Sequence, residues 1–214
     1  MKVFVIGANG QIGKHLIELL RTSDQHTALA MVRSEDQAEA FRQKGVDAVV
    51  ADLEGSVENI AAAAQGCDAV IFTAGSGGHT GADKTLLVDL DGAVKSMEAA
   101  KQAGINRYVM VSALQAHNRE NWNEKIRHYY VAKHYADRML TESGLTYTIV
   151  RPGGLLNEPG TGNVAIAENL TRGSIPREDV AKVVFAALVE PNTYNRGFDL
   201  TSGTVPIASA IKQI

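Results

Sequence analysis

The stretch that decides the fold is Lys2-Val3-Phe4-Val5-Ile6-Gly7-Ala8-Asn9-Gly10-Gln11-Ile12-Gly13, which follows the first methionine. Residues 2–6 form a short run rich in valine and isoleucine that stops at a glycine, and such a run predicts a buried strand. After the last glycine, apolar residues recur at helical spacing, which predicts a helix with one buried face; they are Ile12, Leu16, Ile17, Leu19 and Leu20. The sequence therefore begins with a strand, a glycine-rich loop and a helix.

The glycine-rich loop, residues 7–13, has three glycines separated by two residues each. This spacing suits a sharp turn, close approach of the backbone to a pyrophosphate, and tight packing of helix on sheet. Free backbone amides at the start of the helix, together with the helix dipole, favour an anion there. The alternative is a glycine-rich turn that binds no ligand. The loop lies between a first strand and an amphipathic helix, however, and this position favours a dinucleotide-binding site. We expect the cofactor to contact Gly7, Asn9, Gly10, Gln11, Ile12 and Gly13.

The remainder of the chain alternates short apolar runs with amphipathic stretches. Further strands are predicted near residues 28–32, 48–51, 69–73, 108–112, 147–151 and 198–200. Helices are predicted near residues 35–44, 57–65, 86–103, 129–143 and 177–189. Continuous apolar strands separated by helices indicate an α/β fold, a doubly wound parallel sheet of the Rossmann type. No repeat or linker divides the sequence, so we expect a single domain over residues 1–214 with a minimal C-terminal substrate region.

Composition limits the class of protein. The chain has 21 Lys and Arg against 24 Asp and Glu, a net charge of −3, and 45% apolar residues. This balance argues against a protein that mainly binds nucleic acid or an anionic membrane, and the composition is that of an ordinary globular protein. The single cysteine, Cys67, suits a reducing compartment, and the first apolar run is too short for a signal peptide. We therefore expect a cytoplasmic protein, and the sequence leaves monomer and homodimer open.

The end of the second predicted strand indicates which dinucleotide is bound. An NAD site usually carries Asp or Glu there, which accepts hydrogen bonds from the ribose hydroxyls of the adenosine. This chain instead has Arg33-Ser34, twenty residues beyond Gly13. A guanidinium fork and a hydroxyl suit a phosphate on the ribose, although a solvated surface arginine is the alternative. Arg33 and Ser34 thus favour NADP over NAD.

Three further residues indicate acid–base chemistry. Tyr129 and Lys133 are four residues apart, so they share one face of a helix. A lysine ammonium beside a phenol lowers the pKa of the phenol and makes it a usable proton donor or acceptor near neutral pH. Ser112 ends a predicted strand, at the carboxyl edge where parallel sheets bind ligands, and its hydroxyl can hydrogen-bond a substrate carbonyl. Tyr130, the neighbouring phenol, is only three residues from Lys133 and ranks second.

Several segments together match a known pattern. They are the glycine-rich loop, Ala51-Asp52-Leu53, Ile71-Phe72-Thr73-Ala74-Gly75, Val109-Met110-Val111-Ser112, Tyr129-Tyr130-Val131-Ala132-Lys133 and Arg151-Pro152-Gly153-Gly154. In these segments the sequence resembles the short-chain dehydrogenase/reductase superfamily. The likeness is greatest to its small atypical members, the NAD(P)-dependent epimerase/dehydratase-like proteins or NAD(P)-binding oxidoreductases. The resemblance covers nearly the whole chain.

The resemblance implies roles for residues beyond the glycine-rich loop. Lys133 would hold the nicotinamide ribose in addition to its part in catalysis. Asp52 and Leu53 would contact the adenine. Thr73, Ala74 and Gly75 would line the backbone of the cofactor. Pro152, Gly153 and Gly154 would lie beside the nicotinamide amide. The chain departs from the superfamily at the fourth catalytic position, where Asp89 stands in place of the usual Asn. An ionised aspartate accepts hydrogen bonds but donates none, so a carboxylate that only stabilises its helix is the alternative for Asp89.

These observations favour an NADP-dependent oxidoreductase that acts on a small carbonyl or hydroxyl compound by hydride transfer. Its catalytic residues would be Ser112, Tyr129, Lys133 and Asp89. A non-catalytic NADP-binding redox sensor is the first alternative, although a sensor has no need of this set. An NAD(P)-dependent sugar epimerase or dehydratase is the second, but residues 152–176 leave little chain to enclose a nucleotide sugar. The six histidines show no metal-ligand spacing, so no metal is expected.

Arg33→Ala is expected to remove much of the preference for NADP(H) over NAD(H). A charge-assisted contact to a phosphate contributes roughly 1.5–3 kcal/mol, or about ten- to a hundredfold in affinity. Calorimetric titration of the unmutated protein and the variant with both cofactors measures this ratio. Equal affinities in the unmutated protein would contradict the prediction.

Overall fold

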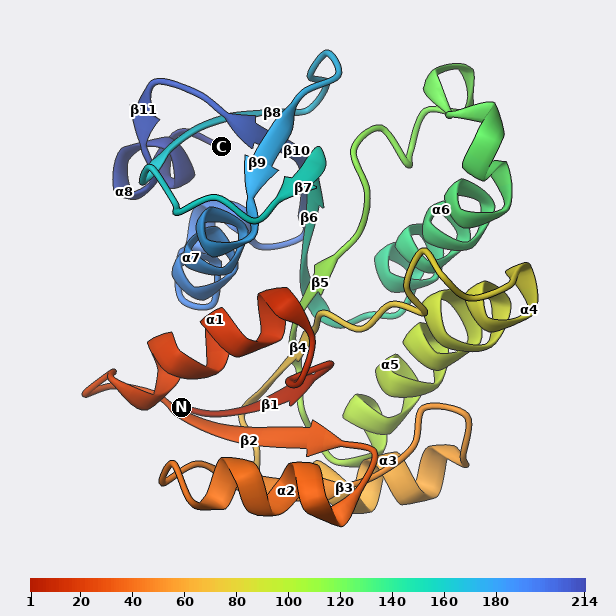
Figure 1. Cartoon of the computed structure of the whole chain (residues 1–214), viewed down its shortest axis with the longest axis vertical. Helices are drawn as coiled ribbons and strands as arrows, with labels where there is room; N and C mark the ends of the chain where they lie inside the picture. Colours follow the sequence, from red (N-terminus) through yellow and green to blue (C-terminus); the bar gives the residue numbers. More distant parts are fainter.

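A nine-stranded sheet forms the centre of the molecule, which Figure 1 shows as a computed structural model of residues 1–214. Its strand order is β11-β8-β10-β6-β5-β4-β1-β2-β3. Neighbouring strands from β10 to β3 are all parallel, whereas β8 runs antiparallel to both β10 and β11. The strands are β1 (Lys2–Ile6), β2 (Thr27–Val32), β3 (Asp47–Val50), β4 (Ala69–Phe72), β5 (Arg107–Val111), β6 (Thr146–Pro152), β8 (Asn163–Ala167), β10 (Arg196–Ser202) and β11 (Val205–Pro206).

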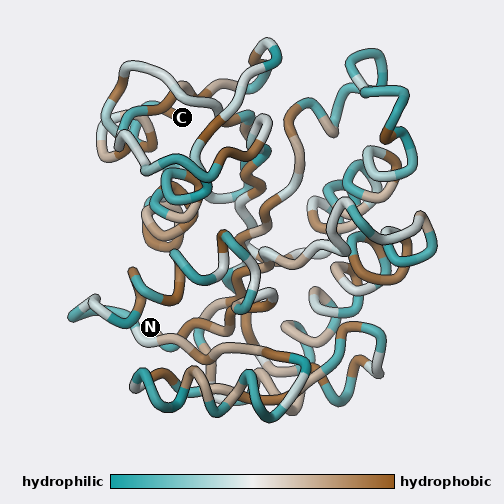
Figure 2. Tube along the Cα trace, viewed as in Figure 1, coloured by the Kyte–Doolittle hydropathy of each residue, from teal (hydrophilic) through white to brown (hydrophobic).

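Helices cover both faces of this sheet, as a doubly wound Rossmann fold requires. One face packs against α1 (Gln11–Arg21), α2 (Glu35–Arg42) and α7 (Arg177–Ala187), with the short α8 (Ile207–Ala210) at its edge. The other packs against α3 (Val57–Ala63), α5 (Ala93–Gln102) and α6 (Arg127–Glu142). Figure 2 shows hydrophobic chain concentrated along the central strands and hydrophilic chain along the outer helices. None of the helices combines the length and the apolar character needed to cross a membrane.

Strand β1 shows how the sheet divides the core. Val3 and Val5 belong to the apolar cluster under α1 and α7, whereas Phe4 and Ile6 belong to the cluster under α3, α5 and α6. Successive side chains of a strand point to opposite faces, so a strand covered on both faces must be apolar at every position. This is why the central strands could be predicted as continuous apolar runs.

The C-terminal third contains short strands that the sequence pattern does not reveal. β8 and β11 extend the sheet past β10, and a separate two-stranded sheet pairs β7 (Gly154–Leu156) with β9 (Ser174–Pro176). These strands are two to five residues long, too short to show a recognisable alternation of apolar residues. The expected parallel sheet therefore has one antiparallel member, β8.

The segment predicted as a single helix near residues 86–103 is divided. It comprises most of a π-helical segment, η1 (Thr85–Gly92), followed by α5, and the short α4 (Ala82–Lys84) precedes it. A π-helix is rare and often lies at a functional site, because its wider turn shifts the side chains that follow. Its last residue, Gly92, lies so close to the Leu53 side chain that a Cβ there would be 3.1 Å away.

A buried ion pair anchors α6 to the sheet. Asp137 Oδ2 on α6 accepts a hydrogen bond from Arg151 Nε on β6 at 2.7 Å, and both side chains are buried. Gly197 on β10 leaves space for the guanidinium, since a Cβ there would lie 2.8 Å from Arg151 Nη2. Because α6 also carries Tyr129 and Lys133, this pair holds the helix in the position on which the site depends.

Asp137→Ala is expected to lower the free energy of unfolding by about 3–5 kcal/mol, because it leaves the Arg151 guanidinium buried and unpaired. Arg138→Ala is the matched control, since Arg138 lies next in α6 and pairs with Glu142 at the surface. That variant is expected to cost less than about 1 kcal/mol. Urea unfolding followed by circular dichroism measures both, and equal costs for the two variants would contradict the prediction.

Candidate active site

The glycine-rich loop joins β1 to α1 at the carboxyl edge of the sheet. Gly7 has a φ of +85°, and a Cβ at this residue would lie 2.6 Å from the backbone nitrogen of Ala74. At Gly13, a Cβ would overlap the carbonyl oxygen of Gly7. Only glycine fits these two positions, the first for the turn and the second for the packing of α1 on the loop.

The start of α1 is left without a side-chain cap. Its N-cap residue is Gly10, whereas α2 and α3 are capped by Ser34 and Ser56, which accept hydrogen bonds from backbone amides. The first amides of α1 have no partner within the helix, and the positive end of its dipole faces outward. An uncapped helix start above a loop of small residues fits the pyrophosphate of a dinucleotide.

Residues after β4 lie beside this loop. Thr73 Oγ1 donates to the carbonyl of Ile6 at 3.0 Å, and the Ala74 backbone lies against Gly7 as described above. Gly75 in turn faces Asp89, since a Cβ at Gly75 would lie 3.1 Å from Asp89 Oδ1. The structure thus brings together the predicted cofactor residues that follow β1 and β4.

The end of β2 contributes Arg33 and Ser34. Arg33 is exposed and its guanidinium has no hydrogen-bond or ion-pair partner, while its backbone N–H donates to Gln37 Oε1 at 3.1 Å. Ser34 has a structural role as the cap of α2, accepting from the Gln37 amide at 3.4 Å. Its hydroxyl hydrogen stays free for a ligand. At the end of β3, Asp52 is exposed and Leu53 is buried.

Lys133 points from α6 into the protein, toward the end of β5. Its Nζ lies 3.3 Å from Asp89 Oδ1 and donates to the carbonyl of Val111 at 3.3 Å. Asp89 Oδ2 accepts a hydrogen bond from the Ser76 amide at 2.9 Å. The side chains of Lys133 and Asp89 are 4% and 1% exposed, so this is a fully buried ion pair. One of the three ammonium hydrogens has no protein acceptor.

Asp89 belongs to the π-helical segment η1, which packs against α6. Asp89 lies inside η1 and is buried, whereas the preceding Leu86 and Leu87 are exposed. The departure from Asn at this position therefore places a negative charge, and not a neutral amide, against the ammonium.

Tyr129 lies beside the same ammonium, with Lys133 Nζ 5.7 Å from the centre of its ring. Burial raises the pKa of Tyr129; the charge of Lys133 opposes this shift and that of Asp89 adds to it. The expectation of a lowered pKa is wrong here, because burial outweighs an ammonium that Asp89 partly neutralises. Burial also disfavours the charge of Lys133, but its electrostatic interactions with Tyr129 and with the Asp89 carboxylate outweigh this effect and raise the pKa of Lys133. Near neutral pH, Tyr129 is protonated and Lys133 is charged.

Ser112 follows β5 and its hydroxyl is buried without a hydrogen-bond partner. Its backbone amide donates to the carbonyl of Val150 at 2.7 Å, which fixes its position beside the end of β6. Pro152 ends that strand, and the next residue, Gly153, donates to the carbonyl of Leu200 at 2.9 Å. Buried hydroxyls in folded proteins are nearly always hydrogen-bonded, so the unpaired hydroxyl of Ser112 marks a place where a ligand can bind.

Tyr130 belongs to a different cluster. Its ring stacks on Trp122 with the ring centres 6.0 Å apart, and both pack with Ala113 and Ala116. Burial raises the pKa of Tyr130 as well. The contact with Lys133 singles out Tyr129, the phenol that the four-residue spacing favours.

No pattern in the sequence singles out Asp199 or Gln115. Asp199 on β10 is fully buried and accepts hydrogen bonds from the amide and Nε2 of Gln115 and from the amide of Leu170. Gln115 has a φ of 61°, a strained conformation for a residue with a side chain. These bonds tie the loop after Ser112 to the loop before β9. The sequence feature that points to this role is a carboxylate, Asp199, inside the strand predicted at residues 198–200.

The cysteine and the histidines add no site. Cys67 is buried, and burial raises the pKa of its thiol, which keeps the thiol protonated and unreactive. No group of three or more His, Cys, Asp or Glu side chains is arranged to hold a metal ion.

Comparison with known proteins identifies the family. The sequence profile of the NAD(P)H-binding family matches residues 7–191, from the glycine-rich loop to the end of the last long helix. The chain belongs to the NAD(P)H-binding family. This result confirms the resemblance that the motifs carry, and the uncapped start of α1 is the part of the structure that fits the cofactor.

Individual relatives cover all or nearly all of the chain. It is 65% identical to the "Uncharacterized sugar epimerase YhfK" of Bacillus subtilis (strain 168) over 214 residues, all of both chains. The crystal structure of the oxidoreductase ylbE from Lactococcus lactis matches with a TM-score of 0.90 and 32% identity, covering 100% of this chain and 96% of the other. ChuY from Escherichia coli O157:H7, named an anaerobillin reductase, matches with a TM-score of 0.81 and 25% identity over 94% and 97% of the two chains.

Asp89→Asn is expected to lower the pKa of Tyr129, because the charge of Lys133 then acts on the phenol without a carboxylate to neutralise it. Ultraviolet titration of the tyrosines measures the change, and the Tyr129→Phe variant identifies which part of the signal belongs to Tyr129. If the protonated phenol of Tyr129 donates a proton in the reaction, activity is lost as the pH rises through the pKa of Tyr129. Because this pKa is lower in Asp89→Asn, the variant should lose activity at a lower pH than the unmutated protein.

Asp91→Asn is the matched control for this titration. Asp91 lies two residues away in η1, but it is exposed and pairs with Lys95. Its substitution should leave the titration of Tyr129 unchanged. A Tyr129 pKa that is unchanged or higher in Asp89→Asn would contradict the prediction.

Proposed function

We propose that this protein is an NADP-dependent oxidoreductase that transfers hydride between the nicotinamide cofactor and a small carbonyl or hydroxyl compound. The observation that carries the proposal is one cluster at the carboxyl edge of the sheet. In it the Lys133 ammonium, held by Asp89 and the Val111 carbonyl, lies beside Tyr129. Ser112, whose hydroxyl has no hydrogen-bond partner, comes directly after Val111 at the end of β5. Similarity to an oxidoreductase and to an anaerobillin reductase supports this class of activity.

Each protein group has a distinct task in this proposal. The bound cofactor supplies or accepts the hydride, which is chemistry that no side chain provides. Tyr129 donates a proton to the carbonyl oxygen as negative charge develops there. Ser112 donates a hydrogen bond to the same oxygen, and this bond strengthens as the charge grows. Lys133 stabilises the tyrosinate that remains after proton transfer.

Burial keeps the proton on Tyr129 at neutral pH, and the charge of Asp89 adds to this effect. The protonated phenol is the form that donates a proton to a carbonyl oxygen, so it suits reduction of a carbonyl near neutral pH. Oxidation of an alcohol by the same site would need the deprotonated phenol, which becomes available at alkaline pH.

The cofactor is proposed to lie across the carboxyl edge of the sheet. The start of α1 would hold its pyrophosphate, and Arg33 and Ser34 would hold the phosphate on its adenosine ribose. The remaining contacts follow the superfamily pattern, with the adenine at Asp52 and Leu53, the cofactor backbone at Thr73, Ala74 and Gly75, and the nicotinamide at Pro152, Gly153, Gly154 and Lys133. Residues 153–176 supply only the short strands β7, β8 and β9 and their loops, which supports a small substrate.

Tyr129→Phe is expected to reduce turnover by ~10²–10⁴, the usual scale for general acid–base catalysis, while cofactor affinity changes little. Tyr130→Phe is the matched control, because it removes the phenolic hydroxyl of the neighbouring residue. The ring of residue 130 stays against Trp122, and Lys133 is not affected. A screen of carbonyl compounds that follows NADPH absorbance identifies the substrate and gives the rates, and calorimetry gives the affinities. Undiminished turnover in Tyr129→Phe would remove Tyr129 from the role.

The other two variants separate binding from chemistry. Lys133→Met should weaken cofactor binding and turnover together, whereas Ser112→Ala should reduce mainly turnover, since its hydrogen bond strengthens only as charge develops. If no carbonyl compound consumes NADPH above background and none of the variants alters turnover, the redox-sensor alternative replaces the enzyme.

A further inference from the structure

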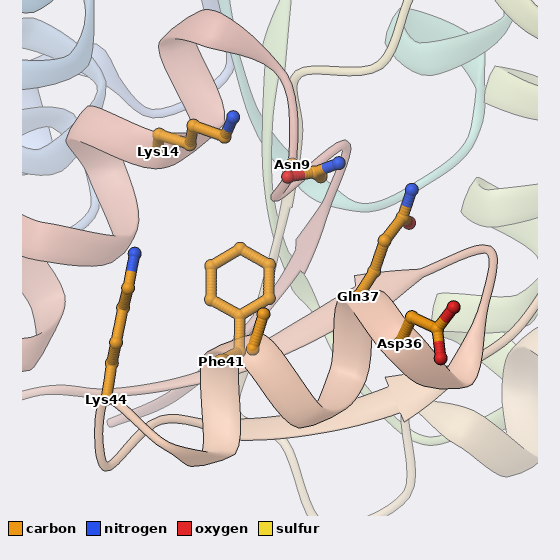
Figure 3. A pocket seen from close by; sticks show the side chains of 7 residues that line it. Asn9, Lys14, Asp36, Gln37, Phe41 and Lys44 are labelled. Carbon is orange, nitrogen blue, oxygen red and sulfur yellow. The ribbon is translucent and has the colours of Figure 1, made fainter.

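Arg172, in the loop between β8 and β9, is a cation to which the proposed function gives no task. It is exposed and has no ion-pair partner, and its side chain makes one hydrogen bond, from Nη2 to the carbonyl oxygen of Asn121 at 3.1 Å. Other unpaired cations lie beside the segments proposed for the cofactor. Arg33 follows β2, and Figure 3 shows Lys14 and Lys44 at a cavity of about 330 Å³ next to the glycine-rich loop. Arg172 lies outside those segments.

Hydrogen bonds join the loop that carries Arg172 to the loop that follows Ser112. They run from Gln115 Nε2 to the carbonyl of Leu170 at 3.0 Å, between His117 Nε2 and Asn169 Oδ1 at 2.9 Å, and from Arg172 to Asn121 as above. Asp199 strengthens this junction from β10, because it accepts hydrogen bonds from the backbone amides of Gln115 and Leu170. Figure 1 shows both loops at the same end of the molecule. The guanidinium therefore has a defined position where the two loops meet.

These two loops also border the place where the substrate would react. The first loop begins after Ser112, which is proposed to bond the substrate carbonyl. The second includes Gly173, whose carbonyl oxygen accepts a hydrogen bond from the Gly154 amide at 2.8 Å, and a Cβ at Gly153 would overlap the same oxygen. Gly153 and Gly154 are proposed to lie beside the nicotinamide. Arg172 is thus one residue from the backbone that contacts this part of the cofactor site.

The charge of Arg172 acts on the neighbour of the proposed proton donor. Burial raises the pKa of Tyr130; the charge of Arg172 opposes this shift and that of Asp199 adds to it. A charge shifts the pKa of another group in this way when the two lie close together. The ring centre of Tyr130 is 6.1 Å from that of Tyr129. The guanidinium therefore lies near the position where a substrate held by Tyr129 would extend.

The chemistry of a guanidinium indicates what Arg172 binds. Five N–H groups form its planar fork, and the hydrogen bond to Asn121 uses one of them. Two parallel N–H groups match the two oxygens of a carboxylate, and a single cation balances its single negative charge. Asp199 does not occupy the fork, because its oxygens accept from N–H groups of Gln115 and Leu170. The free part of the fork is available to a ligand.

We propose, on the basis of the proposed function, that Arg172 determines the substrate class and that the substrate is a carbonyl compound with a carboxylate group. Ser112 and Tyr129 bind the carbonyl oxygen, and the Arg172 fork binds the carboxylate at the other end of the molecule. The carbonyl carbon accepts hydride from the reduced cofactor, which is oxidised, and the carbonyl oxygen accepts the proton of Tyr129. An oxo acid is thereby reduced to a hydroxy acid.

The test compares substrates that differ in this charge alone. Pyruvate and the ortho, meta and para isomers of formylbenzoate place a carboxylate at different distances from a carbonyl group, and their methyl esters keep the carbonyl and lose the charge. NADPH absorbance gives kcat and KM for each acid and each ester. Calorimetric titration of the same compounds into protein saturated with NADP⁺ measures binding without turnover.

Three variants isolate the contribution of the guanidinium. Arg172→Met keeps the apolar stem and removes the charge, whereas Arg172→Lys keeps a point charge and removes the planar fork. Arg196→Met is the matched control. Arg196 is an exposed arginine with no ion-pair partner, and it begins β10, at the end of that strand away from the carboxyl edge of the sheet.

At least one acid is expected to have a kcat/KM about tenfold above that of its methyl ester. A charge-assisted hydrogen bond contributes about ten- to a hundredfold, and the exposure of Arg172 places its contribution near the lower end. In Arg172→Met this ratio of acid to ester should fall about tenfold, mainly through KM, and Arg172→Lys should recover part of it. The ratio should also shrink at high salt. Arg196→Met should match the unmutated protein.

Other outcomes overturn the assignment in distinguishable ways. If Arg172 only supports Asn121, Arg172→Met lowers kcat/KM for acids and esters alike, and the residue has no part in specificity. Equal kcat/KM for every acid and its ester in the unmutated protein overturns the substrate class and leaves the proposed oxidoreductase standing. Binding of an acid to the NADP⁺-saturated protein that depends on Arg172, without turnover of any carbonyl compound, supports the carboxylate site and removes the oxidoreductase activity. Absence of both binding and turnover for every acid overturns the carboxylate site.

Discussion

The close approach of three backbone segments at the centre of the sheet is the constraint on which the rest of the molecule depends. Gly7, Gly13 and Ala74 come together at the carboxyl ends of β1 and β4, and a Cβ on either glycine would occupy space that another backbone atom fills. Because these side chains are absent, α1 begins directly over the sheet edge with its first amides exposed. The loop after β4 can then follow the glycine-rich loop closely and continue to η1.

Two buried ion pairs lie near this edge, and in each pair the opposite charges compensate one another. Removing an ammonium and a carboxylate from water is costly unless they pair, and Lys133 and Asp89 pair at 3.3 Å and share further hydrogen bonds with the backbone. The same rule governs Asp137 with Arg151 beneath α6. The first pair differs from the second because the partly buried phenol of Tyr129 lies beside it. Its charge balance therefore decides a protonation state as well as the position of a helix.

The sequence predicts those features that leave a local trace. The central strands are buried on both faces and so appear as apolar runs, and the i, i+4 spacing of Tyr129 and Lys133 is enough to place both on one helix face. The π-helix leaves no such trace, since it differs from an α-helix by its hydrogen bonds and not by its composition. The pKa of Tyr129 could not be predicted either, because it depends on burial and on Asp89, forty residues earlier in the chain. Ser34 shows a third limit: a serine at the end of a strand fits a helix cap and a phosphate contact equally well.

Exposure also separates two properties of the site. Arg33 lies at the end of β2 and is exposed, whereas Lys133 on α6 and Asp89 in η1 are buried. The exposed charge of Arg33 is screened by salt, so it acts on a phosphate close to it and only weakly on the phenol. The buried charges of Lys133 and Asp89 act strongly over short distances. Because effects at separate sites add when the sites share no partners, the choice of cofactor and the protonation of Tyr129 can vary independently in this fold.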